Sequence, residues 1–224
     1  MSYTLDNLIA ARDTKDIYKD GNKTIKLFKE GISKSNILNE ALNTARVEEN
    51  TDLNIPKLLE VTKIENRWGI VLDYVEGKSL EELMNENPDK VDEYLNLFVD
   101  FQLEVLSKKV PLLGRIKDKF KRKLTDTDMI DENIKYELLQ RLDGMKDSNN
   151  LCHGDFDPSN IIINENGSHY IIDWAHVTMG NAQADAARSF LLFSIQNKEE
   201  IGKKYLELFS KKSGISILEI QRWI

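Results

Sequence analysis

A short stretch of the sequence gathers several polar residues immediately before a run of isoleucines. It begins at Leu151 and reads LCHGDFDPSNIIIN. Asp155 and Asn160 lie five positions apart in it, and Asp173 follows Asp155 by 18 positions, at the end of a second apolar segment. Carboxylate and amide oxygens bind hard divalent cations. The same residue types also cap turns. The spacing of the residues must therefore decide between a metal site and ordinary turn capping.

The elements around these residues predict how they are positioned. The segments NIIIN and HYIID read as two antiparallel strands joined by the turn ENGS. Such a hairpin places Asn160 and Asp173 near the same end, where an amide carbonyl and a carboxylate form an oxygen site suited to Mg²⁺. Asp155 is offset by the loop and is available to accept a proton or a hydrogen bond from a hydroxyl. A metal site and an orienting carboxylate are what phosphoryl transfer requires.

Turn capping is the competing interpretation of the same residues. Asp155, Asp157 and Asn160 surround Pro158, and Asp and Asn side chains commonly bond to the backbone of turns. Any one of these residues alone would favour capping. The complete pattern favours chemistry, because His-Gly-Asp-x-x-x-x-Asn is followed by two strands and a terminal Asp.

The composition is that of an acidic globular protein. Its 224 residues suffice for one large domain or two small lobes with a buried core. Lys plus Arg number 31 against 38 for Asp plus Glu, and the net charge of −7 disfavours nucleic acid as a partner. The one cysteine, Cys152, excludes an internal disulfide. Without a secretory signal or an apolar run of about 20 residues, we expect a cytoplasmic protein with no membrane partner.

The first part of the chain, residues 1–74, predicts a small β-rich lobe. Alternating or apolar segments indicate strands at LIAAR, DIYKD, KTIKLFK, KLLEVTKI and WGIVLDYV, with a tight turn at residues 20–22. One helix is expected over residues 33–50, with Ser33 or Ser35 as its N-cap. Its apolar residues at helical spacing are Ile37, Leu38, Ala41, Leu42 and Ala45.

The rest of the chain, residues 75–224, predicts a larger and mainly helical lobe. Ser79 and Glu82 form a capping box before the helix LEELMNEN. Amphipathic helices are predicted at VDEYLNLFVDFQLEVLSKK and IDENIKYELLQRLDGM, and the chain ends in helices. The basic run of residues 108–123 is interpreted as a solvated helix face rather than a nucleic-acid or membrane patch.

The motifs HGDFDPSN and YIIDW resemble the catalytic and metal-binding segments of the aminoglycoside phosphotransferase and choline kinase-like family. The resemblance extends over nearly the whole chain, and these two segments are its most specific part. It implies a bilobal α+β protein kinase-like fold. The expected parts are a small β-rich N-terminal lobe with one helix and a larger, mainly helical C-terminal lobe.

The resemblance implies roles for several residues of the motifs and assigns no chemistry to Asp157. Asp155 is the implied catalytic residue, which orients the acceptor hydroxyl or accepts its proton. Asn160 and Asp173 are the implied ligands of Mg²⁺. His153 is implied to brace the loop, and Asp185 in GNAQADAARSF is implied to stabilise it.

The implied nucleotide-binding residues lie in the first lobe and the hinge. Lys26 falls where the family's phosphate-binding lysine lies on a strand, and Glu40 falls where its helix supplies the ion-pair partner. A strand lysine and a helix glutamate can meet only if the helix packs on the sheet. In the hinge, backbone groups of Asp73, Tyr74 and Val75 would hydrogen-bond a purine base.

Several features depart from the family pattern or leave it open. The segment RDTK between the first two strands contains no glycine, so it lacks the Gly-rich loop that covers phosphates in protein kinases. Thr14 or Lys15 is the candidate replacement. Lys23 and Lys29 are rivals of Lys26. In the family, part of the acceptor-selecting region follows the residue that Asp185 matches; with 39 residues after Asp185, we expect a reduced helical substrate cap.

The main prediction is an ATP- or GTP-dependent phosphotransferase that uses Mg²⁺ and moves the γ-phosphate to a hydroxyl of a small molecule. An aminoglycoside- or choline-like acceptor is one possibility, and the sequence does not choose among acceptors. The alternative is a nucleotide-binding regulatory pseudokinase module, against which the intact Asp155, Asn160 and Asp173 argue. A protein kinase is disfavoured, because Asp185 lies only 12 positions after Asp173, which leaves no room for an extended activation segment.

Overall fold

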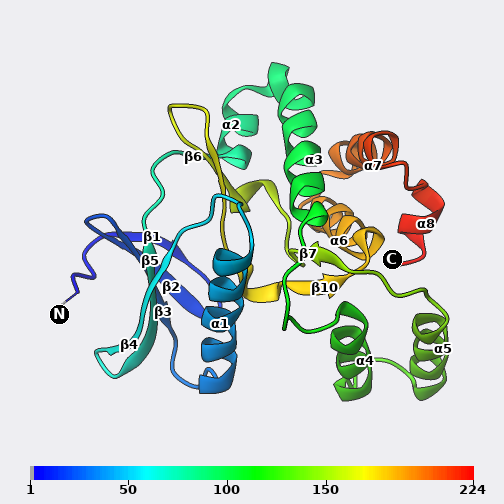
Figure 1. Cartoon of the computed structure of the whole chain (residues 1–224), viewed down its shortest axis with the longest axis horizontal. Coiled ribbons are helices and arrows are strands. Elements are labelled where there is room, and N and C mark those ends of the chain that lie inside the picture. Colours follow the sequence, from blue (N-terminus) through cyan, green and yellow to red (C-terminus); the bar gives the residue numbers. More distant parts are fainter. Residues whose placement is uncertain (1–2) are drawn as a thin grey trace. The chain divides into compact units, whose positions relative to one another are not determined.

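The computed structural model describes residues 3–224, which group into two compact units (Figure 1). The first unit consists of the residues up to Tyr94 together with Pro158–His176, and the second of Leu95–Asp157 with Val177–Ile224. The lobe boundary between residues 74 and 75 stays a prediction. Over the described range, no helix combines the length and the apolar character needed to cross a membrane.

The first unit is built on a five-stranded antiparallel sheet with the strand order β1-β2-β3-β5-β4. The strands lie where the sequence predicted them. They are β1 (Leu8–Ala11), β2 (Lys15–Asp20), β3 (Lys23–Phe28), β4 (Leu58–Ile64) and β5 (Arg67–Asp73).

The turn between β2 and β3 sets the register of these two strands. It consists of Gly21 and Asn22, and Gly21 has a φ of 59°, a left-handed conformation that glycine adopts without a steric penalty. In this register Ile17 lies opposite Lys26, and Lys15 lies two residues before Ile17. Since opposed residues share a face and side chains alternate along a strand, Lys15 and Lys26 project from the same face of the sheet.

Helix α1 (Lys34–Asn50) packs on that face of the sheet. The shared apolar core contains Phe28 and Ile70 from the strands and Ile37 and Ala41 from the helix. Ser33 is the N-cap residue but makes no capping bond, because its hydroxyl lies 2.7 Å from that of Ser35. The helix is therefore held mainly by packing against the sheet.

The predicted apolar face of α1 is wrong at two positions. Leu38 and Leu42 are 40% and 47% exposed, whereas Glu40 is only 8% exposed. The helix is turned so that Ile37, Ala41 and Glu40 face the sheet. This orientation lets Glu40 form ion pairs with lysines of the sheet, described below, and leaves Leu38 and Leu42 exposed.

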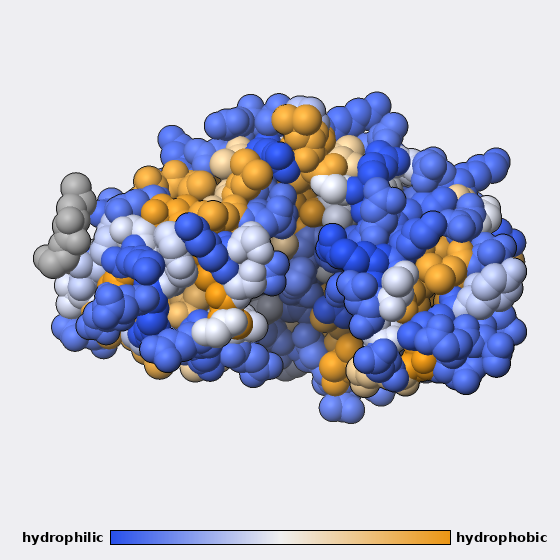
Figure 2. Space-filling view, turned by 90° about the horizontal axis from the view of Figure 1, so that it is seen from below, coloured by the Kyte–Doolittle hydropathy of each residue, from blue (hydrophilic) through white to orange (hydrophobic). Residues whose placement is uncertain are grey.

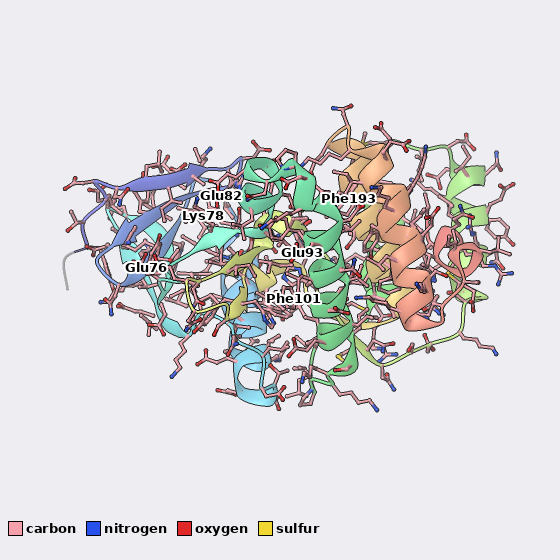
Figure 3. All side chains as sticks on the ribbon, turned by 90° about the horizontal axis from the view of Figure 1, so that it is seen from above. Glu76, Lys78, Glu82, Glu93, Phe101 and Phe193 are labelled. Carbon is pink, nitrogen blue, oxygen red and sulfur yellow. The ribbon has the colours of Figure 1, made fainter. Side chains whose placement is uncertain are left out.

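The first unit also contains the predicted hairpin and a short helix. Strands β8 (Ile161–Ile163) and β9 (His169–Ile171) pair in antiparallel fashion, and β6 (Lys78–Ser79) joins the edge of β8. The capping box that starts α2 (Leu80–Glu86) is confirmed, because Ser79 and Glu82 exchange side-chain to backbone hydrogen bonds. Figure 3 shows Lys78 and Glu82 close together at the start of this helix. Short 3₁₀ turns occur at Pro88–Lys90, Pro158–Asn160 and Trp174–His176.

The second unit is mainly helical. Its helices are most of α3 (Val91–Ser107), α4 (Ile116–Asp126), α5 (Glu132–Asp143), α6 (Ala182–Ile195), α7 (Glu199–Ser213) and α8 (Ile217–Gln221). A two-stranded sheet of β7 (Asn150–Cys152) and β10 (Thr178–Gly180) accompanies them. The core is aromatic, and the ring centroid of Phe98 lies 5.0 Å from Phe156, 5.7 Å from Phe193 and 5.6 Å from Tyr205.

The prediction of a solvated helix face over residues 108–123 is wrong in part. Helix α4 begins only at Ile116, and the residues before it form no helix. Pro111 and Gly114 interrupt helical geometry there. The carbonyl of Gly114 instead accepts a hydrogen bond of 2.9 Å from the N–H of Met179, which ties the segment to β10.

Hydrophilic side chains predominate on the face drawn in Figure 2, and apolar side chains appear there as separate patches. In the first unit the exposed large apolar residues lie on β1, α1 and β4. They are Leu8, Ile9, Leu38, Leu42 and Leu59. Scattered exposed apolar side chains are ordinary on protein surfaces, so we assign them no partner.

Candidate active site

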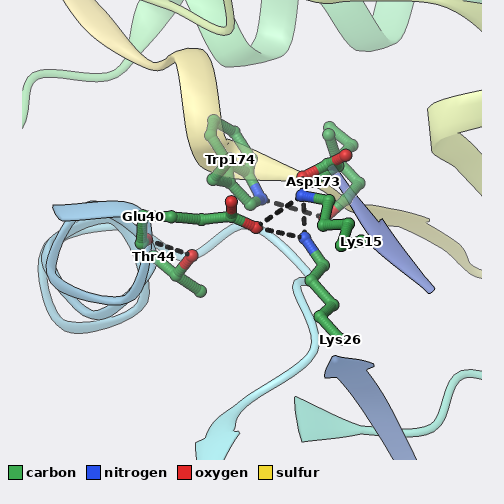
Figure 4. Close-up of polar contacts among 7 residues, drawn as sticks. Lys15, Lys26, Glu40, Thr44, Asp173 and Trp174 are labelled. Carbon is green, nitrogen blue, oxygen red and sulfur yellow. Dashed lines mark hydrogen bonds and ion pairs between the residues drawn. The ribbon is translucent and has the colours of Figure 1, made fainter. Parts of the chain in front are cut away.

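Four charged side chains of the first unit form a compact cluster, shown in Figure 4. Lys26 Nζ lies 2.8 Å from Glu40 Oε1 and 2.7 Å from Asp173 Oδ1. Lys15 Nζ lies 2.8 Å from the same oxygen of Glu40 and 3.3 Å from the same oxygen of Asp173. The structure thus brings together three residues predicted for the site, and Lys15 completes what we call the four-charge cluster.

The cluster is largely shielded from solvent. The side chains of Lys15, Lys26 and Glu40 are 9–10% exposed, while that of Asp173 is 31% exposed. Burial opposes the charge of Lys26, but Asp173 and Glu40 outweigh it and raise the pKa of the lysine. In the same way, burial would raise the pKa of Asp173 and of Glu40, yet the two lysines lower both. The carboxylates are therefore ionised at neutral pH, and Asp173 is the most accessible member.

Hydrogen bonds of the residues on both sides of Asp173 hold it in place. It is the second residue after β9 and has a φ of 63°, a left-handed conformation that is uncommon outside glycine. The N–H of Ile172 donates to the carbonyl of Asn160 at 2.9 Å, and the indole of the buried Trp174 donates to the carbonyl of Ile171 at 3.0 Å. The first of these bonds also keeps the backbone of Asn160 beside that of Asp173, as the hairpin predicted.

The residues around Asp173 fit a magnesium ion. Mg²⁺ is usually held by one or two carboxylates and takes its remaining ligands from phosphates and water. Asp173 would supply a carboxylate, and Asn160, whose backbone carbonyl is bonded to the N–H of Ile172, would supply a side-chain amide oxygen. Among the residues that the structure describes, no three His, Cys, Asp or Glu side chains form a group that could hold a metal. A metal at this place would therefore depend on the mixed Asn–Asp pair.

Asp155 belongs to the second unit, where its loop is firmly braced. Its Oδ1 lies 3.2 Å from Arg188 Nη2. The preceding N–H, that of Gly154, donates to Asp185 Oδ1 at 2.7 Å, and Gln102 donates to the other oxygen of Asp185 at 3.1 Å. His153 is fully buried. The contacts of Asp185 and the burial of His153 are what is expected if both residues support this loop, as the resemblance implies.

Asp157, for which the sequence suggested no role, is a structural residue. It is buried, and its Oδ2 accepts a hydrogen bond of 2.8 Å from Gln196, which caps the C-terminus of α6. The hydroxyl of Ser189 donates to the carbonyl of Phe156 at 2.8 Å. Both contacts tie the loop after Asp155 to α6.

The predicted hinge residues are partly engaged within the first unit. The N–H of Asp73 donates to the carbonyl of Lys57 at 3.0 Å, and the N–H of Tyr74 donates to that of Asn22 at 2.8 Å. These two N–H groups already donate hydrogen bonds within the protein and are not available to a nucleotide base. A base would therefore meet Asp73 and Tyr74 through their carbonyl oxygens, or would use Val75.

An open groove of about 770 Å³ lies elsewhere in the first unit. Its lining residues come from the segment around β6 and from the β8–β9 turn. They are Glu76, Gly77, Lys78, Leu83, Ile163, Asn164, Glu165 and Asn166. The predicted site residues are absent from this lining, so we do not connect the groove with the chemistry.

Lys119, on α4, is a partly buried cation in the unit that contains Asp155. Burial lowers its pKa to about 8, and the positive charges of Lys123 and Arg188 add to the effect. A lysine with a lowered pKa costs stability while it is protonated. That cost is fully present below about pH 8 and is relieved as the pH rises from 8 through the unfolded value of 10.5.

Replacing Lys119 with methionine is expected to remove this cost. The free energy of unfolding at pH 7 should rise by about 1–2 kcal/mol, after discounting for partial exposure, and its increase with pH between 8 and 10.5 should flatten. Urea unfolding at several pH values measures both effects. Lys121→Met, which changes an exposed lysine of the same helix, is the matched control. An unchanged pH slope in Lys119→Met would contradict the prediction.

Comparison with solved structures identifies the class of fold. An aminoglycoside-3'-phosphotransferase of type VIII matches with a TM-score of 0.67 at 14% identity, over 99% of this chain and 91% of that chain. The streptomycin–ATP–APH(2")-IIa ternary complex matches with a TM-score of 0.66 at 17% identity, over 100% and 82%. A choline/ethanolamine kinase family protein from Mesorhizobium loti matches with a TM-score of 0.58 at 14% identity, over 97% and 74%. The predicted α+β protein kinase-like fold is confirmed.

The sequence itself identifies the family. Residues 25–214 match the phosphotransferase enzyme family, and because this covers most of the chain, the protein belongs to that family. The predictions of the family and of a phosphotransferase enzyme are thereby confirmed. A comparison of the sequence with curated proteins found no match.

Proposed function

We propose that this protein transfers the γ-phosphate of ATP, in the presence of Mg²⁺, to a hydroxyl group of a small molecule. The main support for the proposal is that Lys26 Nζ lies 2.8 Å from Glu40 Oε1 and 2.7 Å from Asp173 Oδ1, in a chain of the phosphotransferase family. A strand lysine fixed by a helix glutamate, next to a metal-binding aspartate, is an arrangement that serves phosphoryl transfer in kinases.

The proposed roles follow from the chemistry of each side chain. Lys26 neutralises nucleotide phosphates, and Glu40 fixes its position. Asn160 and Asp173 are the metal ligands, and Mg²⁺, when bound, offsets the negative charge of the phosphates. Asp155 orients the acceptor hydroxyl and accepts its proton. Catalysis would come mainly from positioning and charge neutralisation.

The base-binding role of the hinge is part of the same proposal. Asp73, Tyr74 and Val75 would offer backbone groups to a purine, with the first two limited to their carbonyl oxygens by the bonds described above. ATP is favoured as the nucleotide, because one structural neighbour is a complex with ATP and streptomycin. GTP is the comparison nucleotide in the test.

For the acceptor, we propose a small molecule that carries both a cationic nitrogen and a hydroxyl. The structural neighbours are named for aminoglycosides, for streptomycin and for choline or ethanolamine. Each of these compounds combines the two groups, the nitrogen of choline being a quaternary ammonium. An overall charge of −7 is compatible with a cationic acceptor.

A panel assay tests the proposal. Nucleotide consumption is measured with ATP or GTP, with Mg²⁺ or excess EDTA, across aminoglycosides, choline, ethanolamine, sugars and amino-alcohols. We expect Mg²⁺-dependent turnover that one class of hydroxyl acceptor raises well above the rate with water alone. Nucleotide binding in calorimetry without turnover on any acceptor would instead favour a regulatory module. Failure to bind either nucleotide would contradict both.

A further inference from the structure

The turn between β1 and β2 lacks the usual means of binding phosphate. Kinase folds place glycines there so that backbone N–H groups approach the phosphates closely. Here residues 12–14 are Arg, Asp and Thr. The turn is also tied down, because the N–H of Arg12 donates to the carbonyl of Lys15 and the N–H of Lys29 donates to that of Thr14, both at 2.9 Å.

At the end of this turn, Lys15 is buried in an unusual position for a lysine. Its side chain is 9% exposed, and its Nζ lies 2.8 Å from Glu40 Oε1 and 5.6 Å from the ring centroid of Phe28. Lysines are almost never fully buried unless they are paired. The burial of Lys15 therefore indicates that its positive charge has a function within the four-charge cluster.

The charges of the cluster balance only while Asp173 is available to the lysines. Lys15 and Lys26 together carry two positive charges, and Glu40 and Asp173 carry two negative ones. Both lysines reach the same oxygen of Asp173, the residue proposed to bind the metal. Once a cation takes that carboxylate, two ammonium groups share Glu40 alone, and a buried charge without a partner is strongly unfavourable. A phosphate oxygen restores the balance.

We propose that Lys15 is a second phosphate-binding residue, which exchanges Asp173 for a nucleotide phosphate and thereby replaces the missing Gly-rich loop. The proposal rests on the proposed function. Of the two lysines, Lys15 has the longer contact with Asp173, 3.3 Å against 2.7 Å for Lys26, so it gives up this carboxylate more readily. Lys15 is also the first residue after the β1–β2 turn, which is the segment that covers the phosphates in kinase folds with a Gly-rich loop.

Affinity measurements give the first test. Lys15→Met is expected to weaken the binding of Mg²⁺–ATP by about 10- to 100-fold, the range for losing one hydrogen bond to a charged group. Binding of adenosine, which has no phosphate, should change by less than about twofold on the same reasoning. Lys15→Arg keeps the charge and should recover part of the affinity for ATP. Lys29→Met, which removes an exposed lysine beside the same turn, is the matched control.

Chemical labelling gives the second test, which a merely structural lysine would not pass. In an acyl-phosphate derivative of ATP, a lysine amine near the terminal phosphate attacks the acyl carbonyl and releases ATP. Mass spectrometry of the labelled chain should find both Lys15 and Lys26 modified, each protected by excess ATP. Modification of Lys26 alone, with the ATP affinity of Lys15→Met unchanged, would overturn the role of Lys15. Absence of nucleotide binding by the unaltered chain would overturn the proposed function as well.

Discussion

Replacing Asp155 with asparagine is expected to lower the rate of phosphoryl transfer by about 100- to 10,000-fold, the range for loss of a general base. Asparagine has nearly the same shape and can still accept a hydrogen bond from Arg188, which lies 3.2 Å from the carboxylate. It cannot accept the proton of the acceptor hydroxyl. Nucleotide affinity should change by less than about threefold, because no nucleotide-binding role is assigned to this side chain.

The neighbouring aspartate is the matched control for this prediction. Asp157→Asn makes the same chemical change two residues away, at a side chain that accepts a hydrogen bond from Gln196 and has no proposed contact with substrate. It should keep turnover within about threefold of the unaltered protein. Steady-state turnover with the best acceptor, together with calorimetry of nucleotide binding, measures the two effects separately. Equal turnover by Asp155→Asn and the unaltered protein would remove Asp155 from its assigned role.

The sequence predicted the elements of the fold well, because their signals are local. Alternation identified the five strands of the sheet, and Ser79 with Glu82 identified the start of α2. The meeting of Lys26 with Glu40 followed from one further requirement, that the helix packs on the sheet. The hairpin predicted that Asn160 and Asp173 lie near the same end, because its short turn restricts how the two strands can pair.

Lys15 was named only as one of two candidates, although the signal for it was present. The turn at Gly21 and Asn22 fixes the pairing of the two strands, and counting back along that pairing puts Lys15 on the same face as Lys26. A lysine on a sheet face that packs against a helix is then expected to be buried and paired. What no local pattern shows is that Glu40 and Asp173 each use one oxygen for both lysines.

The errors on the helices have a different cause, the competition between apolar and charged groups for the interior. Leu38 and Leu42 fit a helical stripe as well as Ile37 and Ala41 do, so hydrophobic spacing alone cannot choose the buried side. In the structure the buried side is the one that carries Glu40 and its ion pairs. Similarly, basic residues in sequence suggest solvation, but the burial of Lys119 depends on packing that only the folded chain reveals.

Replacing Asp173 with asparagine is expected to abolish the effect of Mg²⁺ on nucleotide binding. Asparagine keeps the shape and one oxygen, but it removes the carboxylate that draws a divalent cation. The affinity for Mg²⁺–ATP should fall by at least about 100-fold, roughly 3 kcal/mol. The substitution also leaves Lys15 and Lys26 with only Glu40 as a counter-charge, so the free protein should have a lower Tm, as expected when a buried ion pair loses one partner.

The dissociation constant of ATP without Mg²⁺, divided by that with Mg²⁺, distinguishes a loss of metal binding from this loss of stability. ATP affinity is measured by calorimetry with Mg²⁺ and again with excess EDTA, at a temperature well below the Tm of the variant. The unaltered protein should bind ATP more tightly with Mg²⁺, whereas Asp173→Asn should show a ratio near one. Asp89→Asn, at an exposed position of the same unit, should keep both the ratio and the Tm. If Asp173→Asn retained the full Mg²⁺ effect, the metal would have to be held by other groups, and the exchange proposed for Lys15 would lose its cause, since that exchange begins when the cation takes Asp173.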